Sequence, residues 1–171
     1  MKAALSALAA VALACSLSGC LGYRLGETKP GTLKKIHKIA VTTFANNTYL
    51  PRIEGLVTNT IIKQIQQDGT YQVTSIDQAD AVMHGTVTSI GRGPARSVRG
   101  NVLATTEFNL GITVVWTLYL KGGGPIMGPA TNSGGTSFFV GSDVTTDERQ
   151  ALPLATEDLA VRLVSQLTEG W

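Results

Sequence analysis

Cysteine is almost missing from this chain of 171 residues, which contains only Cys15 and Cys20. No cysteine follows Cys20, so residues 21–171 can form no disulfide, no cysteine-based zinc site and no thiol nucleophile. A single unpaired thiol would be a liability in an oxidising export compartment. The same sulfur is stable there when it carries a thioether-linked lipid.

The first residues have the pattern of an exported lipoprotein. Lys2 supplies one positive charge, and the run from Ala3 to Leu17 is apolar and of signal-peptide length, too short for a comfortable permanent membrane span. The run closes with Leu17-Ser18-Gly19-Cys20, which matches the lipobox at which bacterial lipoproteins are acylated and cut. We therefore predict a signal peptide over residues 1–19, lipidation of Cys20 and attachment to a membrane.

No second long hydrophobic run is present from Ala40 onward, so no transmembrane helix is expected there. Residues 20–33 contain three glycines and Pro30, and they are predicted to form the lipidated N-terminus and a linker. Residues 34–171 have a length that suits one domain. The formal net charge of the chain is only +2, and such a balance gives no reason to expect a nucleic-acid partner.

The motifs of common enzymes are missing as well. The G-x-S-x-G pattern does not occur, and the segment Gly91–Arg96 lacks both phosphate-loop spacings. His37 and His84 fall in predicted strands without a second metal ligand at a suitable spacing. No pair of carboxylates resembles a general acid and base. The sequence therefore predicts a protein that is not an enzyme and that uses no cofactor and no metal ion.

Hydrophobic periodicity predicts a mixture of strands and helices. From Phe108 to Leu120 every even position is apolar, which predicts a long strand with one buried face. Other strands are predicted over residues 36–44, 71–75, 81–91 and 136–141, and helices over residues 51–67 and from a capping-box pattern at Thr145 and Glu148 to the C-terminus. The glycine-rich residues 121–135 are predicted to be a flexible connection. An alternating sheet with two amphipathic helices gives an α+β two-layer sandwich, whose second sheet face is polar and available to a partner.

The most prominent polar cluster consists of Arg92, Arg96 and Arg99, which lie between two predicted strands. Guanidinium groups pair bidentately with phosphate, so three of them on one loop suit a phosphorylated lipid or another polyanion. The alternative is a solvated loop whose charges only keep it soluble. The sequence leaves both interpretations open.

Six short stretches have a family resemblance when they are taken in order. They are Cys20–Leu25 (CLGYRL), Ile39–Thr48 (IAVTTFANNT), Pro51–Glu54 (PRIE), Ala79–Gly85 (ADAVMHG), Glu107–Leu110 (EFNL) and Asp158–Val164 (DLAVRLV). Together they resemble the LptE family of lipopolysaccharide-assembly lipoproteins over nearly all of residues 20–171. The resemblance implies a four-stranded, mostly antiparallel sheet with two helices on one face. The glycine-rich residues 121–135 depart from the family pattern.

The resemblance also implies a function. LptE-like proteins lie as a plug inside the outer-membrane β-barrel LptD, help it assemble and assist lipopolysaccharide delivery to the outer leaflet. For this chain the resemblance implies an LptD-like partner and an outer-membrane location on the periplasmic side, which Leu21 after the lipidated cysteine also fits. The expected mechanism is binding without turnover, with Arg92, Arg96 and Arg99 as the contacts to lipopolysaccharide phosphates.

Two other functions compete with this one. Outer-membrane lipoproteins that activate a peptidoglycan synthase also contain strands like Ile39–Phe44, but they usually need a long linker after the lipid. Residues 21–33 span at most about 45 Å when fully extended, which is short for crossing a periplasm. A lipid-anchored hydrolase would require the acid and base residues that the sequence lacks.

Overall fold

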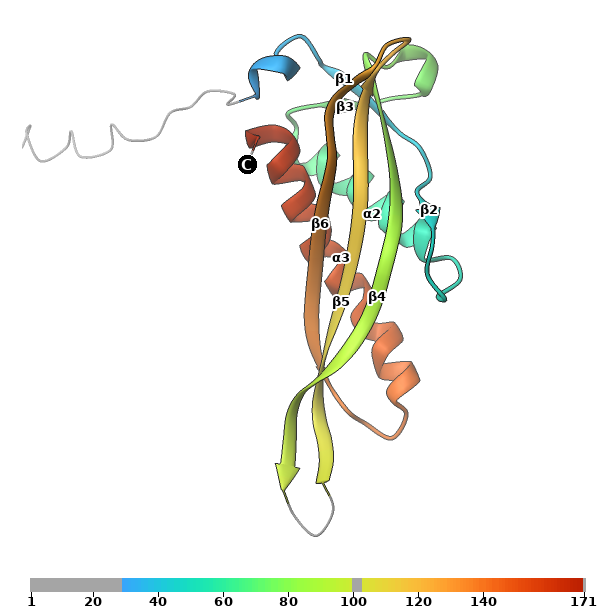
Figure 1. Ribbon diagram of the computed structural model, residues 1–171, viewed down its shortest axis with the longest axis vertical. Helices are drawn as coiled ribbons and strands as arrows, with labels where there is room; N and C mark the ends of the chain where they lie inside the picture. Colours follow the sequence, from blue (N-terminus) through green and yellow to red (C-terminus); the bar gives the residue numbers. More distant parts are fainter. Residues whose placement is uncertain (1–28, 100–102, 171) are drawn as a thin grey trace, which may run out of the picture.

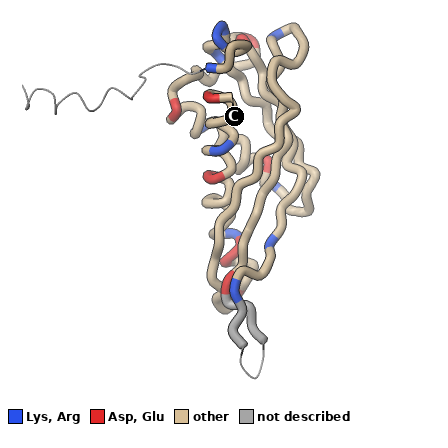
Figure 2. The backbone as a smooth tube through the Cα atoms, turned by 60° about the vertical axis from the view of Figure 1, so that its left-hand side comes forward, with Lys and Arg blue, Asp and Glu red and all other residues tan. Residues whose placement is uncertain are grey.

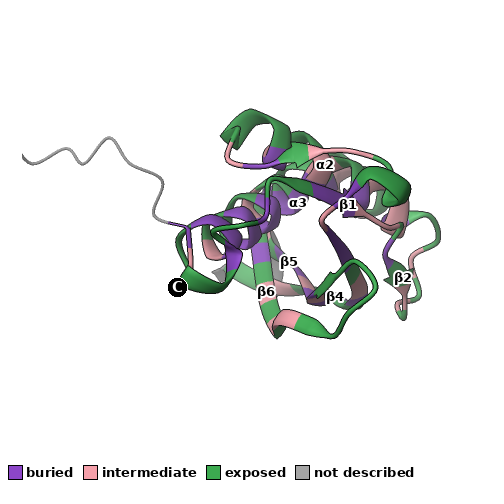
Figure 3. Ribbon diagram, turned by 90° about the horizontal axis from the view of Figure 1, so that it is seen from above, coloured by how far each residue is buried: buried purple, intermediate pink, exposed green. Residues whose placement is uncertain are grey.

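The computed structural model describes residues 29–99 and 103–170, and the side chains of residues 29–96 and 107–170. In this part of the chain the strands form one sheet, and two helices cover one of its faces (Figure 1, Figure 3). The predicted α+β two-layer sandwich is confirmed. The elements are η1 (Gly31–Leu33), β1 (Lys38–Val41), β2 (Ala45–Asn46), α2 (Ile53–Asp68), β3 (Gln72–Val73), η2 (Ile76–Gln78), β4 (Ala81–Arg99), β5 (Leu103–Leu120), β6 (Pro125–Phe139) and α3 (Val144–Glu169).

The sheet has the strand order β3-β1-β4-β5-β6, and β2 also pairs with β4. The three long strands β4, β5 and β6 are antiparallel, whereas β1 is parallel to β3 and β4, and β2 is parallel to β4. The sheet is thus mostly antiparallel, as predicted. Its described part has six strands where the resemblance implied four, and β2 and β3 are short strands of two residues each.

The prediction of a flexible connection over residues 121–135 is wrong, because β6 begins at Pro125. The prediction relied on the glycines of this segment. Gly134 is the clearest case: a Cβ at this position would lie 2.1 Å from the backbone nitrogen of Leu159 in α3. Glycine stands here because the helix backbone approaches the strand closely, and not because the chain turns.

The prediction of a loop around the three arginines is also wrong. β4 continues to Arg99 and β5 begins at Leu103, so residues 92–99 belong to a long hairpin. Pro94 pairs with Phe108 next to a register shift in the β4–β5 ladder. Proline is tolerated at such an irregularity, because a bulge already interrupts the ladder hydrogen bonds.

The core lies between the sheet and the helices (Figure 3). The predicted alternation along β5 is confirmed from Leu110 to Leu118, where even positions are buried and odd positions are more exposed, whereas Leu120 at the strand end is exposed. The buried side chains of β5 are Leu110, Ile112, Val114, Trp116 and Leu118. The predicted stripe of α3 is buried throughout, and that of α2 is buried at Ile53, Val57, Ile61 and Ile65.

Helix ends follow local chemistry. The side chain of Asp143 caps α3 by accepting hydrogen bonds from the Thr145 N–H at 3.0 Å and the Thr146 hydroxyl at 2.6 Å. The predicted capping box at Thr145 is therefore wrong by two residues, and Asp143 is the cap. The Thr146 hydroxyl, followed by the Thr145 N–H, holds the pKa of Asp143 below its ordinary value.

The described chain begins inside the segment that was predicted as a linker. Leu33 is fully buried, and Lys29 is 7% exposed with its ammonium 4.9 Å from the centre of the Tyr71 ring. The packed structure therefore reaches back to Lys29. The predicted signal peptide and the predicted lipidation site at Cys20 lie outside the described residues.

Candidate interaction surface

The middle of the sheet face opposite the helices is made of small, uncharged residues of β4, β5 and β6, whereas the larger side chains of Tyr119 and Phe139 are exposed nearer the strand ends. Three neighbours, Ser89, Thr113 and Ser133, form one row across the strands, and the Thr113 and Ser133 hydroxyls are 2.9 Å apart. The next row consists of Gly91, Gly111 and Gly135. Figure 2 shows this middle part of the long strands without lysine, arginine, aspartate or glutamate.

This part of the sheet face can form hydrogen bonds with a partner and allows its close approach. The backbone groups of the central strand β5 are paired with both neighbours, so the side-chain hydroxyls are the groups left to donate and accept hydrogen bonds. The glycine row carries no side chains and lets another surface approach the backbone closely. The face suits a broad polar partner and does not form an enclosed site.

The three candidate arginines lie on one strand, and the described two are directed to different faces. A register shift between Val87 and Ser89 changes the alternation of β4, so that Arg92 pairs with Leu110 on the helix-covered face. A second shift, between Pro94 and Arg96, places Arg96 opposite Glu107. The structure therefore does not gather Arg92 and Arg96 into one cluster. The Arg99 side chain lies outside the described side chains.

Carboxylates already engage both of these arginines. Arg92 forms an ion pair with Glu148 in the first turns of α3, and its guanidinium lies 5.7 Å from the centre of the Phe108 ring. Arg96 is 3.8 Å from the Glu107 carboxylate, and its side chain is 72% exposed. Arg92 thus holds the hairpin to α3, whereas Arg96 is the more accessible cation.

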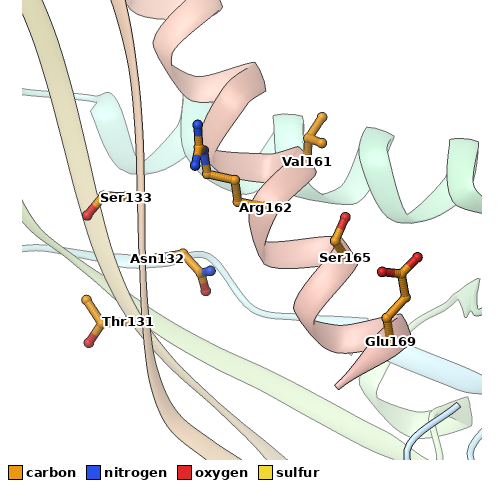
Figure 4. A pocket seen from close by; sticks show the side chains of 7 residues that line it. All are labelled: Thr131, Asn132, Ser133, Val161, Arg162, Ser165 and Glu169. Carbon is orange, nitrogen blue, oxygen red and sulfur yellow. The ribbon is translucent and has the colours of Figure 1, made fainter. Parts of the chain in front are cut away.

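A groove of about 530 Å³ runs between the free edge of β6 and the C-terminal half of α3 (Figure 4). Thr131, Asn132 and Ser133 line one side, and Arg162 and Glu169 lie on the other. Asn132 accepts a hydrogen bond from the Trp116 indole at 2.6 Å, which fixes this wall to the core. These β6 residues escaped the sequence prediction because they stand in the segment interpreted as a loop.

Asp80 and His84 have structural roles. Asp80 accepts the backbone N–H groups of His37 and Lys38, both at 2.9 Å, and these bonds hold the pKa of Asp80 below its ordinary value. His84 lies 3.1 Å from the Thr42 hydroxyl. Within the described residues no group of three or more histidine, cysteine, aspartate or glutamate side chains could hold a metal ion, and no helix is long and apolar enough to cross a membrane.

The model of the LptE family, described as lipopolysaccharide-assembly, matches residues 36–167. This chain belongs to the LptE family. The family is one of lipopolysaccharide-assembly lipoproteins whose members are not enzymes. The expectation drawn from the six short stretches is therefore confirmed at the level of the family.

Solved structures share the LptE-like fold at low identity. A minor lipoprotein from Acinetobacter baumannii aligns with a TM-score of 0.54 and 15% identity, over 79% of this chain and 94% of that chain. A protein from Xanthomonas campestris aligns with a TM-score of 0.53 and 12% identity, over 78% of this chain and 85% of that chain. At these identities the likeness shows the fold alone. No curated protein matches the chain.

Proposed function

We propose that this protein is an outer-membrane lipoprotein, tethered on the periplasmic side through Cys20, that occupies the lumen of an LptD-like β-barrel. There it helps the barrel assemble and assists delivery of lipopolysaccharide to the outer leaflet, by binding and without turnover. Membership of the LptE family supports the role in lipopolysaccharide assembly. The observation that carries the barrel contact is the uncharged hydroxyl and glycine face of β4, β5 and β6.

The chemistry of this face suits the wall of a barrel. The inner walls of outer-membrane barrels are polar, so a plug must offer hydrogen-bonding groups rather than an apolar patch. The row of Ser89, Thr113 and Ser133 offers such groups at regular spacing, and the glycine row beside it permits close approach. A face without fixed charges also avoids burying an unpaired ion when the barrel closes around it.

The hairpin end of the molecule is the proposed contact to lipopolysaccharide, through Arg92, Arg96 and Arg99. The Arg96–Glu107 pair is long, at 3.8 Å, and the Arg96 side chain is 72% exposed, so the pair contributes little and a phosphate can reach the guanidinium. Arg92 is held more firmly by Glu148. Arg96 is therefore expected to contribute more than Arg92 to an anionic ligand.

Crosslinking from the open face tests the barrel contact. A photoreactive residue in place of Thr113 or Ser133 is expected to label a large β-barrel protein in the membrane, and the same residue at Gln66 on α2 serves as the comparison. If a barrel is recovered with the protein but neither sheet position labels it, the assignment of this face is wrong. If no barrel is recovered at all, the proposed function is wrong.

Neutral substitution of the arginines tests the lipopolysaccharide contact. R92Q/R96Q/R99Q is expected to lower binding of lipopolysaccharide at least tenfold at low salt, whereas K34Q/K35Q, which removes cations elsewhere, is expected to bind normally. Glutamine is preferred to glutamate here because Arg92 faces Glu148. Unchanged binding by the triple variant would remove these arginines from the proposal.

The length of the tether weighs against the peptidoglycan-synthase activator. Because Lys29 and Leu33 are buried in the domain, only residues 21–28 separate the lipidated position from the packed structure. Eight residues span at most about 28 Å when fully extended. Such a tether favours a partner in the same membrane. Recovery of a peptidoglycan synthase with the protein would reverse this preference.

A further inference from the structure

A second groove lies between the start of α2 and the start of α3, away from the open sheet face. It consists of two adjoining hollows of about 550 Å³ and 310 Å³ that share Leu50, Arg149 and Leu152 as walls. The chain segments that meet here are the loop before α2 and the first turns of α3. Neither the family assignment nor the proposed barrel contact gives this groove a role.

The walls of the larger hollow are mostly apolar. Ile53 and Leu152 are buried, at 2% and 7% exposure, and Leu50 and Leu56 are half-buried. Pro51 and Pro153 complete the apolar wall. The free energy falls when a hydrocarbon group displaces water from an open apolar groove.

The rim of the groove is cationic. Arg52 and Arg149 both line the larger hollow and are exposed, and neither forms an ion pair with a residue that the structure describes. Glu148 is the one carboxylate lining either hollow, and Arg92 already neutralises it. Asp143 lies close enough to Arg149 for a weak electrostatic effect but is fully exposed.

The backbone is irregular beside both arginines. Arg52 precedes α2 with φ of 67°, in the left-handed region that residues other than glycine seldom adopt. Pro153 lies inside α3 and has no N–H, so the carbonyl of Arg149 lacks the usual hydrogen bond from the residue four positions later. The groove thus combines apolar walls with two arginines, of which Arg149 lines both hollows and Arg52 lines the larger one.

We propose that this groove binds one acyl chain of an anionic phospholipid, with the headgroup phosphate paired to Arg52 and Arg149. Charge complementarity selects an anionic headgroup, and the apolar walls select a hydrocarbon tail over a free phosphate. Lipopolysaccharide shares the same chemistry, but a groove of this volume accommodates one chain and not a multiply acylated glycolipid. The proposal does not rest on the barrel contact, nor on Arg96 or Arg99; Arg92 enters it only as the partner that keeps Glu148 paired at the wall of the smaller hollow.

The test uses the full lipidated protein in vesicles that contain phosphatidylglycerol with a photoreactive acyl chain. Mapped crosslinks are expected at residues 50–56 and 149–153, and R52Q/R149Q is expected to lower them at least fivefold. The control K34Q/K35Q also removes two exposed cations but is expected to leave labelling unchanged. Equal loss in both variants would mean general attraction to an anionic surface and would overturn the proposal.

Three further arms complete the test. Phosphatidylcholine with the same photoreactive chain is expected to label the groove at least fivefold less, and equal labelling would overturn the role of the arginines. Inorganic phosphate in the millimolar range is expected not to compete, and competition would reassign the groove to free phosphate. Displacement of the label by equimolar lipopolysaccharide would reassign it to the glycolipid. None of these results depends on whether a barrel is recovered.

Discussion

The carboxylate of Asp158 in α3 accepts a hydrogen bond from the backbone N–H of Gly135, at 2.9 Å, on the free edge of β6. The two oxygens of the same carboxylate share the Nε–H of Arg162, one turn later in the helix, at 3.0 and 3.1 Å. Asp158 therefore closes the sandwich along an edge strand that carries no charge of its own from Pro125 to Phe139. Natural edge strands are commonly protected by such means.

Replacement of Asp158 by asparagine is expected to lower the free energy of unfolding by about 0.5–1 kcal/mol at neutral pH, a modest value because the side chain is partly exposed. The hydrogen bond from Arg162, followed by that from Gly135, lowers the pKa of Asp158 in the folded state. This contribution is present above the ordinary aspartate pKa of about 4 and is lost as the pH falls through the lowered value.

Urea unfolding between pH 2 and pH 7 measures this effect. The difference between wild type and D158N is expected to shrink as the medium becomes more acidic than about pH 4. The control is E157Q, because Glu157 is the neighbouring residue and its pair with Lys63 is exposed and 3.9 Å long. A difference for D158N that is independent of pH would show that the charge of Asp158 does not act as proposed.

The G134A variant is expected to lose at least about 2 kcal/mol of stability. The added Cβ would lie 2.1 Å from the Leu159 nitrogen and 2.6 Å from the Ala155 carbonyl, and the helix backbone cannot move away locally. The matched control is G111A on the open face, where a Cβ meets nothing within 4 Å. Thermal unfolding compares the two, and equal stability would contradict the close packing of α3 on β6.

These glycines also show where sequence reasoning fails. The period-two pattern of β5 and the apolar stripe of α3 predicted the core correctly, because the spacing of apolar residues along the sequence determines which face of a strand or helix is buried. The need for glycine at position 134 arises from the approach of Leu159, which belongs to a distant element. Local composition alone made β6 look like a loop.

The candidate sites could be predicted from the sequence less completely than the core. Sequence identified Arg92, Arg96 and Arg99 as a cluster of charges, but the bulges that turn Arg92 and Arg96 to different faces leave no clear sequence signal. The groove between α2 and α3 could not be predicted, because Arg52 and Arg149 line the same hollow but lie far apart in the sequence. The open polar face was predictable, since it follows from the odd positions of β5.

The ion pair between Arg92 and Glu148 is expected to contribute about 1 kcal/mol in a double-mutant cycle of alanine variants. The Glu148 side chain is only 12% exposed and Arg92 is 43% exposed, so water screens this pair less than a surface pair. The equivalent cycle for Arg96 and Glu107 is expected to give a smaller value, because Glu107 is similarly buried at 16% exposure but the pair is 3.8 Å long and Arg96 is 72% exposed. Urea unfolding at low salt measures both couplings, and a larger value for the second pair would contradict the placement of Arg92.

The Thr58 hydroxyl links α2 to the strand region, and its loss is expected to be costly. Thr58 is 5% exposed, and its oxygen accepts the Phe44 N–H at 3.0 Å while donating to the Glu54 carbonyl at 2.7 Å. T58V keeps the shape of the side chain but leaves a buried N–H without its partner. The expected loss is about 1–3 kcal/mol, the cost of an unsatisfied buried donor.

Two variants separate the hydrogen bond from the shape of the Thr58 side chain. T58S keeps the hydroxyl and is expected to recover most of the stability lost in T58V. T156V removes a buried hydroxyl that bonds the Leu152 carbonyl of its own helix, so no backbone N–H loses a partner. T156V is therefore expected to cost less than T58V in urea unfolding. If the two valine variants were equally unstable, the Phe44 N–H would not be the source of the loss, and the connection between α2 and the loop after β1 would have to rest on packing alone.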